Sequence, residues 1–178
     1  MAMKMDRRSF LKTSAAVAVA ASMTGLLGGC GDSNPLAPNE VRVGQYRISI
    51  DNLNIGYGGS ELEGLKRTLK AKVTLKFEGG QNDFQSTSYA GMFKGSIAGE
   101  ELETVAPVSG QLIASNFMWG SLLGKTTVDL EMLFKTEKAL EAYRSGTPVV
   151  LTIKIAGNTA TMYLLKQDGK YVALRELI

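Results

Sequence analysis

The sequence predicts a mainly β domain, a β-rich α+β fold in which a single antiparallel sandwich or open barrel carries one packed helix. Residues 68–78 alternate between apolar and polar side chains, as a strand does when one face is buried and the other meets water. Gly157-Asn158 and Asp168-Gly169 separate apolar runs in the manner of tight hairpin turns. Residues 137–145 have the only convincing helical pattern.

The expected strands begin near residue 41. Within 68–78 the apolar face carries Leu69, Ala71, Val73, Leu75 and Phe77, and within 126–135 it carries Val128, Leu130, Met132 and Phe134. We expect further strands at 41–50, 89–98 and 109–117, the second weakened by Gly91 and Gly95, together with a glycine-rich turn at 52–60, a loop at 79–88 and a turn or short helical piece at 99–103.

The helix and the last strands are indicated by their end signals. Thr136 can cap the helix, Glu137 suits its positive end and Gly146 fits its stop. Leu140 and Tyr143 stand three residues apart, so one helix face can dock on the sheet. After Pro148 the pattern predicts a three-stranded meander, with strands at 149–156, 159–166 and 171–177.

The first residues differ from the rest. Asp6-Arg7-Arg8-Ser9-Phe10-Leu11-Lys12 resembles the twin-arginine motif that the Tat translocase reads, with Arg7, Arg8, Phe10, Leu11 and Lys12 as the export signal. The uncharged stretch 13–27 that follows is about fifteen residues long, shorter than the roughly 20 that span a bilayer. It is therefore interpreted as a processed signal and is excluded from the fold.

Leu27-Gly28-Gly29-Cys30 resembles a lipobox, in which lipoprotein signal peptidase cleaves before a cysteine that carries acyl chains such as palmitate. This resemblance implies that Cys30, the sole cysteine, is lipidated. Two or three acyl chains, at about 0.8 kcal/mol per buried CH2, make a stable anchor. The expected organisation is a signal peptide at 1–29, a lipid-anchored tether at 30–40 and one domain at 41–178, held on a membrane of the bacterial envelope and facing the periplasm. Position 31, directly after Cys30, is Gly rather than the Asp that favours retention in the inner membrane. The sequence is therefore also compatible with a location in the outer membrane.

The composition of the chain limits the kinds of partner, catalytic site and metal site that it can have. The leader carries Lys4, Arg7, Arg8 and Lys12 against Asp6, so it accounts for the whole formal charge of +3 and the mature chain is neutral. Nothing therefore points to nucleic acid as a partner. The chain has no His and its one Cys is Cys30, so a Ser-His-Asp triad and the usual His or Cys metal sites are excluded, and no cofactor is expected.

The segment between two expected strands holds the single Trp and is apolar. It contains Phe117, Met118, Trp119, Leu122 and Leu123. Aromatic residues are favoured where a surface touches lipid, a ligand or a partner, so this segment is a possible contact loop. The alternative is a strand pair that turns through the core.

Three further patterns have ordinary interpretations beside functional ones. Residues 56–60 are glycine-rich but lack phosphate-loop spacing, which favours a turn. The acidic side chains of Asp83, Glu100, Glu101 and Glu103 could serve a hydrolase or calcium, or could form a solvated turn. Lys70, Lys72 and Lys76 form a stripe that could meet anionic lipid or polysaccharide, or could protect an edge strand.

Residues 124–151, with Gly124, Asp129-Leu130 and the run Thr136-Glu137-Lys138-Ala139-Leu140, resemble the strand–helix end of SYLF lipid-binding domains. The resemblance implies a phospholipid-interacting module. The leading expectation is instead a non-catalytic lipoprotein that binds an envelope protein or an apolar ligand, and the third alternative is a carboxylate-based hydrolase.

Overall fold

The computed structural model describes residues 35–58, 66–80, 83–115 and 125–177. The chain divides into two units, 1–34 and 35–178, and all described residues belong to the second. The signal residues Arg7, Arg8, Phe10, Leu11 and Lys12, together with Cys30, lie outside the described residues.

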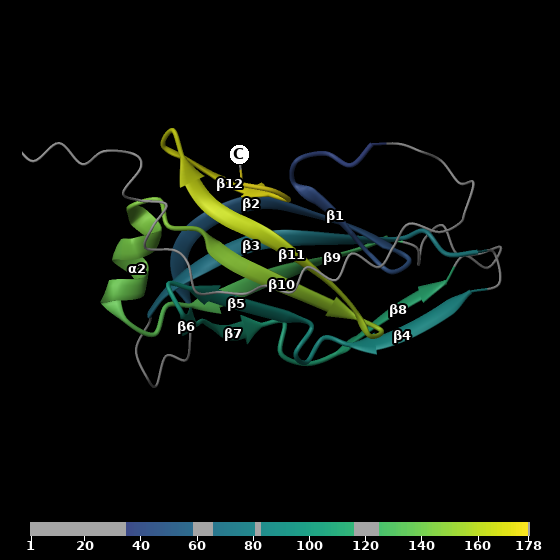
Figure 1. Cartoon of the computed structure of the whole chain (residues 1–178). Coiled ribbons are helices and arrows are strands. Elements are labelled where there is room, and N and C mark those ends of the chain that lie inside the picture. Colours follow the sequence, from purple (N-terminus) through teal and green to yellow (C-terminus); the bar gives the residue numbers. More distant parts are fainter. Residues whose placement is uncertain (1–34, 59–65, 81–82, 116–124, 178) are drawn as a thin grey trace, which may run out of the picture. The chain divides into compact units, whose positions relative to one another are not determined.

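Two five-stranded antiparallel sheets make up most of the domain (Figure 1). The first sheet has the order β1 (Glu40–Val43), β2 (Tyr46–Gly58), β3 (Lys66–Phe77), β9 (Lys125–Leu133), β7 (Glu103–Ala106). The second has the order β12 (Lys170–Leu174), β11 (Asn158–Gln167), β10 (Val149–Ile155), β5 (Phe93–Ile97), β6 (Glu100–Glu101). A separate two-stranded ribbon pairs β4 (Phe84–Ser88) with β8 (Gln111–Ser115).

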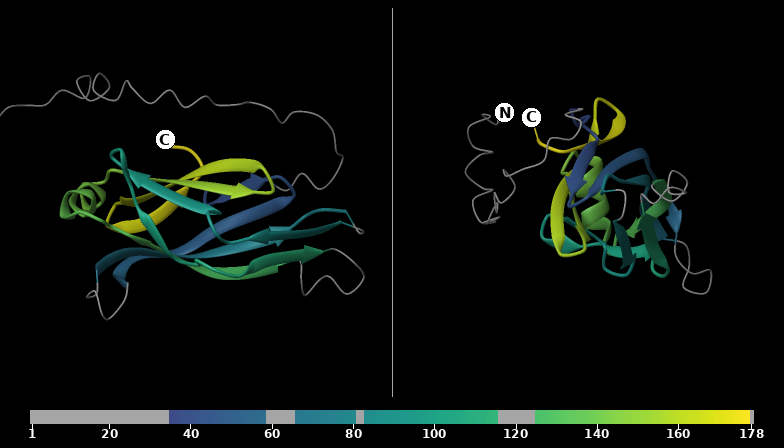
Figure 2. Two further views of the ribbon diagram at one scale, coloured as in Figure 1. Left: turned by 90° about the horizontal axis from the view of Figure 1, so that it is seen from below. Right: turned by 90° about the vertical axis from the view of Figure 1, so that its right-hand side faces the viewer.

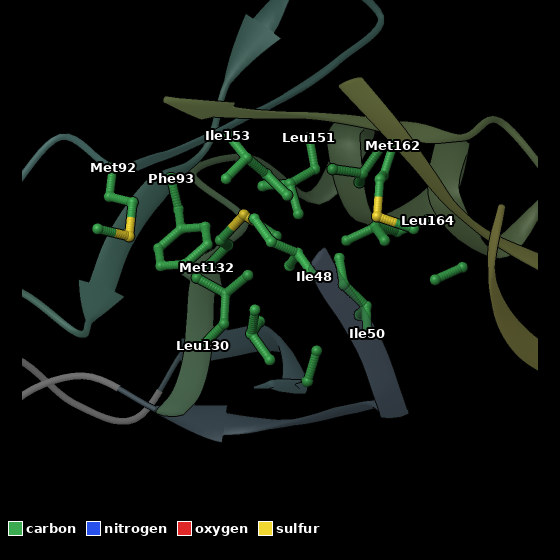
Figure 3. Packing of buried hydrophobic residues seen from close by; sticks show 14 of the residues in the cluster. Ile48, Ile50, Met92, Phe93, Leu130, Met132, Leu151, Ile153, Met162 and Leu164 are labelled. Carbon is green, nitrogen blue, oxygen red and sulfur yellow. The ribbon is translucent and has the colours of Figure 1, made fainter. Parts of the chain in front are cut away.

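The two sheets share one hydrophobic core. Figure 3 shows Ile48, Ile50, Leu130 and Met132 of the first sheet pointing toward Phe93, Leu151, Ile153, Met162 and Leu164 of the second. All the side chains of this cluster come from residues 41–173. The antiparallel sheets do not close into a barrel, and the predicted β-rich fold with one packed helix is confirmed. Figure 2 shows the domain from two further directions.

The chain changes sheets at Leu102, between β6 and β7. Leu102 is buried and donates its backbone N–H to the carbonyl of Gly95, at 2.8 Å. The hydroxyl of Thr104 on β7 donates to the carbonyl of Phe93, at 3.0 Å. These bonds connect the edges of the two sheets. The turn expected at 99–103 is confirmed at Gly99, which makes a tight turn with Ala98, with φ of 83° and 49°. The rest of the expectation is wrong, because the chain continues from this turn into the short strands β6 and β7.

The helix α2 (Glu137–Arg144) has the predicted ends. Thr136 accepts a hydrogen bond from the backbone N–H of Ala139, at 3.2 Å, and Gly146 has a φ of +96°. Ala139, Leu140 and Tyr143 form its buried face. The side chain of Tyr143 packs on Phe134 and stacks on Tyr171 of β12, with ring centroids 5.9 Å apart. The helix thus covers one end of the core.

Three expectations about strands need correction. The strand expected at 41–50 is a hairpin, β1–β2, that turns at Gly44-Gln45. The loop expected at 79–88 contains β4, whose inward side chains include Gln85 and Thr87 and so give no apolar alternation. The turn expected at 52–60 belongs to β2 as far as Gly58, with a register shift between Asp51 and Asn54. The strands expected at 68–78, 109–117 and 126–135 are present with different bounds, and that expected at 89–98 is limited to Phe93–Ile97.

The C-terminal meander is present, with its turns defined by backbone conformation. Gln167 pairs with Lys170 around Asp168-Gly169, as predicted. The preceding turn lies one residue earlier than expected: Ile155 pairs with Asn158, so Ala156-Gly157 make the turn with φ of 47° and 82°. Both turns have the positive φ values that two-residue hairpins require.

Candidate functional site: the charged outer face and the β4–β8 ribbon

The β4–β8 ribbon has one buried and one exposed face. Leu112 and Ala114 of β8 belong to the core. On the other face, Phe84 is 65% exposed and Ile113 is 46% exposed. Ile113 is paired with Ser86, two residues from Phe84, so the two exposed apolar side chains are diagonal neighbours on one surface. An exposed aromatic–aliphatic pair of this kind is a candidate contact surface.

Polar contacts fix the ribbon beside the β1–β2 turn. The side-chain amide nitrogen of Gln45 donates to the carboxylate of Asp83, at 2.9 Å, and its oxygen accepts from Gln85, at 2.8 Å. Asp83 also accepts from the backbone N–H of Gly80, at 2.6 Å. Asp83 therefore organises the connection from β3 to β4.

The predicted contact segment, with Phe117, Met118, Trp119, Leu122 and Leu123, lies outside the described residues. Its flanks are described: β8 ends at Ser115 and β9 begins at Lys125. The two alternatives for this segment, a contact loop or a strand pair that turns through the core, stay predictions.

Two of the acidic residues considered for catalysis, Glu100 and Asp83, are held by separate partners. Glu100 accepts a hydrogen bond from the hydroxyl of Thr136 beside α2, at 2.8 Å. Asp83 is held by Gln45 and Gly80 at the ribbon, and Figure 1 draws β6 and the ribbon toward different ends of the sheets. Among the described residues, no group of three or more acidic, His or Cys side chains could hold a metal ion. The geometry gives no support to a carboxylate or calcium site here.

The stripe of Lys70, Lys72 and Lys76 lies on β3, which is a central strand between β2 and β9. The proposed edge-strand role is therefore wrong. Lys70 and Lys72 form ion pairs of 2.8 Å with Glu131 and Asp129 on β9. Each lysine lies directly opposite its partner in the register, so most of the stripe's charge is balanced.

A second basic pattern runs across the strands rather than along one. Arg42 pairs with Arg47, Arg47 with Lys76 and Lys76 with Lys125, so one basic residue from each of β1, β2, β3 and β9 lies in register. Directly opposed residues project on the same side of a sheet. We call these four residues the cross-strand basic row. It could not be found from the sequence because its members are far apart in the chain and are aligned only by strand register.

Two carboxylates lie against the row. Glu78 contacts Arg42 at 2.8 Å, Arg47 at 3.5 Å and Lys76 at 3.6 Å. Glu40 lies 3.8 Å from Arg47. No ion pair involves Lys125 within the described part of the chain. Among the described residues, the row thus has four cationic groups against two carboxylates, which is an excess of positive charge.

The glycines at the start of the predicted turn have a packing role in β2. A Cβ placed at Gly58 would lie 2.8 Å from a carboxylate oxygen of Glu131 and 2.9 Å from Thr68 Cγ2. Thr68 belongs to the polar face of the alternating pattern at 68–78 but is buried, and its side chain lies against the position that a Cβ of Gly58 would take. Close strand approach therefore explains Gly58.

Among the described residues, the groups with shifted pKa values are tyrosines. Burial raises the pKa of Tyr143 strongly, and the neighbouring Tyr171 raises it further. Burial also raises the pKa of Tyr46, with Tyr89 adding to the effect. Neutral phenols in the core have no evident catalytic role, so these shifts concern stability.

Comparison with known proteins locates one feature of the chain. The family model for the twin-arginine translocation pathway signal sequence matches residues 4–24, which include Arg7, Arg8, Phe10, Leu11 and Lys12. The predicted Tat signal is therefore confirmed, and it directs export across the cytoplasmic membrane to the envelope or periplasm. No curated protein and no solved structure matches the chain. In the described ranges no helix is both long and apolar enough to cross a membrane.

Proposed function

We propose that the exported protein is a lipoprotein of the cell envelope, whose β domain is a non-catalytic binding or structural module. The observation that carries the proposal is the position of Cys30, the sole cysteine, directly after Leu27-Gly28-Gly29 and six residues beyond the matched signal. Cleavage there and acylation of the new N-terminus would hold the domain on a membrane.

The start of the domain is compatible with a short anchor. The carbonyl of Pro38 accepts a hydrogen bond from the backbone N–H of Arg175, at 2.8 Å. The amide of Asn39 donates to the carboxylate of Asp51, at 2.9 Å. The end of the expected tether is therefore attached to the domain, and the eight residue steps from Cys30 to Pro38 span at most about 29 Å.

The test compares the full-length protein with its Cys30→Ala variant, each expressed in a bacterium that has the Tat and lipoprotein export pathways. Membranes are washed in about 0.5 M salt, which screens electrostatic attachment. Wild-type protein should remain in the membrane pellet and show the mass of acyl chains on its N-terminus, and Cys30→Ala should do neither. Ser33→Ala is the matched control and should behave as wild type. Equal retention of Cys30→Ala would contradict the lipid anchor.

We propose that a partner protein binds the exposed face of the β4–β8 ribbon. Side chains from both sheets meet in one core cluster, which favours a surface over the interior as the place of contact. Phe84 and Ile113 supply that surface, and aromatic side chains are typical anchors of protein interfaces. The apolar ligand, the SYLF-like phospholipid module and the carboxylate hydrolase have no comparable observation in their favour.

A photo-crosslinking amino acid at position 84, introduced into the full chain in its native host, tests this surface. We expect a discrete adduct with one envelope protein, and its loss when Ile113→Ser is added. The same crosslinker at Tyr57, an aromatic residue that is 53% exposed on β2, should not give that adduct. Identical adducts from both positions, or none from position 84, would count against the ribbon as an interface.

A further inference from the structure

The cross-strand basic row differs from the other charges on the outer face of the first sheet. Lys70 and Lys72 each have one carboxylate partner directly opposite. In the row, Glu78 is shared by three cationic groups, and Lys125 has no ion pair with any described residue. Arg42, Lys76 and Lys125 are exposed, whereas Arg47 lies half-buried between them.

The spacing of the row suits a flat, extended anionic surface. Neighbouring strands are about 4.8 Å apart, so four strands place these charges along a line of about 14 Å. The line is one residue wide on each strand and lies on the face of a sheet rather than in a pocket. Such a line can meet several negative groups in one plane at the same time.

The lipid anchor brings one particular surface to this row. β1 begins at Glu40, two residues after Pro38, and carries Arg42. The first member of the row is therefore about 7 Å along the strand from its start, on the edge strand to which the tether leads. Within the reach of the tether, the membrane that holds Cys30 is the nearest extended surface.

We propose that the cross-strand basic row binds the phosphate groups of anionic phospholipids in the membrane that anchors the chain. This inference rests on the lipid anchor of the proposed function, which supplies the membrane, and on charge complementarity, which selects anionic headgroups. Basic residues near a membrane surface are attracted to anionic lipids, and the attraction falls within a Debye length. The row and the anchor together orient the first sheet against the bilayer.

The mature chain is neutral, so its net charge does not draw it to a negative surface. Binding of the domain to anionic lipid must therefore come from the local excess of positive charge in the row. The loss of binding must then depend on which lysines are substituted rather than on how many. This distinction gives the experiment its control.

The experiment measures sedimentation of residues 31–178 with vesicles. This chain contains the whole hydrophobic cluster and lacks Cys30, so acylation cannot contribute. Vesicles of phosphatidylglycerol and phosphatidylcholine are compared with phosphatidylcholine alone at about 0.01 M salt, where the Debye length is about 30 Å. We expect binding to the anionic vesicles only, and its loss at about 0.5 M salt.

The decisive variant is Lys76→Gln/Lys125→Gln. Each basic residue near an anionic surface contributes about five-fold to affinity, so the double variant should bind about ten-fold or more weakly. The matched control is Lys94→Gln/Lys154→Gln, which removes the same charge from two exposed lysines on the outer face of the second sheet. The control should bind within about two-fold of wild type.

Equal losses in the two double variants, equal binding to neutral vesicles, or no binding to anionic vesicles would each overturn the proposal. Binding to dextran sulfate that depends on Lys76 and Lys125, without binding to vesicles, would assign the row to an anionic polymer and overturn the lipid assignment. The salt-washed membranes of the Cys30→Ala experiment report on the anchor alone, so failure of the anchor and failure of the row are distinguishable.

Discussion

Gly95 on β5 lies against the sulfur of Met132 on β9, so that a Cβ placed at Gly95 would be 2.5 Å from Met132 Sδ. The two residues belong to different sheets, and Met132 has no exposed surface. The glycine that weakens the alternation of β5 in the sequence is therefore the place where the sheets approach each other closely.

Gly95→Ala should lower the free energy of unfolding by about 1–3 kcal/mol, because an added methyl group in a packed core forces its neighbours to move. Urea unfolding followed by circular dichroism measures the change. In a Met132→Val background, which removes Sδ, the same substitution should cost less. An equal cost in both backgrounds would show that the sulfur contact is not the cause.

The hydroxyl of Thr136 has two roles, since it accepts from Ala139 N–H at 3.2 Å and donates to Glu100 at 2.8 Å. Thr136→Ala should lower the free energy of unfolding by about 1 kcal/mol, the usual effect of losing an N-cap. Thr136→Ser keeps the hydroxyl and is the matched control. Thermal unfolding compares them, and an alanine variant as stable as the serine variant would contradict the cap's contribution.

Tyr143 should make the domain sensitive to alkali. Burial raises the pKa of its phenol above the ordinary value of 10.0, so the folded state keeps the proton after the unfolded state has begun to lose it. The stabilising contribution is complete below pH 10.0 and decreases as the pH rises from there through the higher folded pKa. The loss is at most about 1.4 kcal/mol per pH unit.

Tyr143→Phe should reduce this alkaline loss while leaving the fold intact, because the hydroxyl of Tyr143 has no hydrogen-bond partner among the described residues. Urea unfolding at pH 8 and at pH 11 measures the difference. Tyr57→Phe, at an exposed position, is the control. A pH dependence that is the same in Tyr143→Phe and wild type would argue that this residue stays accessible to hydroxide. Part of the dependence should persist, since burial also raises the pKa of Tyr46.

The elements predictable from the sequence are those in which local pattern and tertiary environment agree. Leu69 through Phe77 alternate because one face of β3 is in the core, and α2 carries its own cap at Thr136. β4 was missed because its inward residues include Gln85 and Thr87, which are half-buried at the ribbon rather than deep in the core. The cross-strand basic row depends on register between strands far apart in the chain, which no local pattern encodes.

The export signal gives a prediction for the part of the chain outside the described residues. Arg7 and Arg8 lie within the matched twin-arginine signal. Arg7→Lys/Arg8→Lys keeps both positive charges but replaces two planar guanidinium groups by ammonium groups, which differ in hydrogen-bonding geometry. A translocase that recognises the paired guanidinium groups should therefore fail to export the variant, and the uncleaved precursor should accumulate in the cytoplasm.

Cell fractionation and the mass of the N-terminus measure this outcome. Lys4→Gln, which removes a charge from the matched segment but leaves the arginine pair, is the control and should be exported as wild type. If the lysine pair were exported at the wild-type level, charge alone would suffice and the arginine pair would not be the signal. If Lys4→Gln failed as well, the total charge of the leader would govern export. Only loss confined to the arginine variant agrees with specific recognition of Arg7 and Arg8.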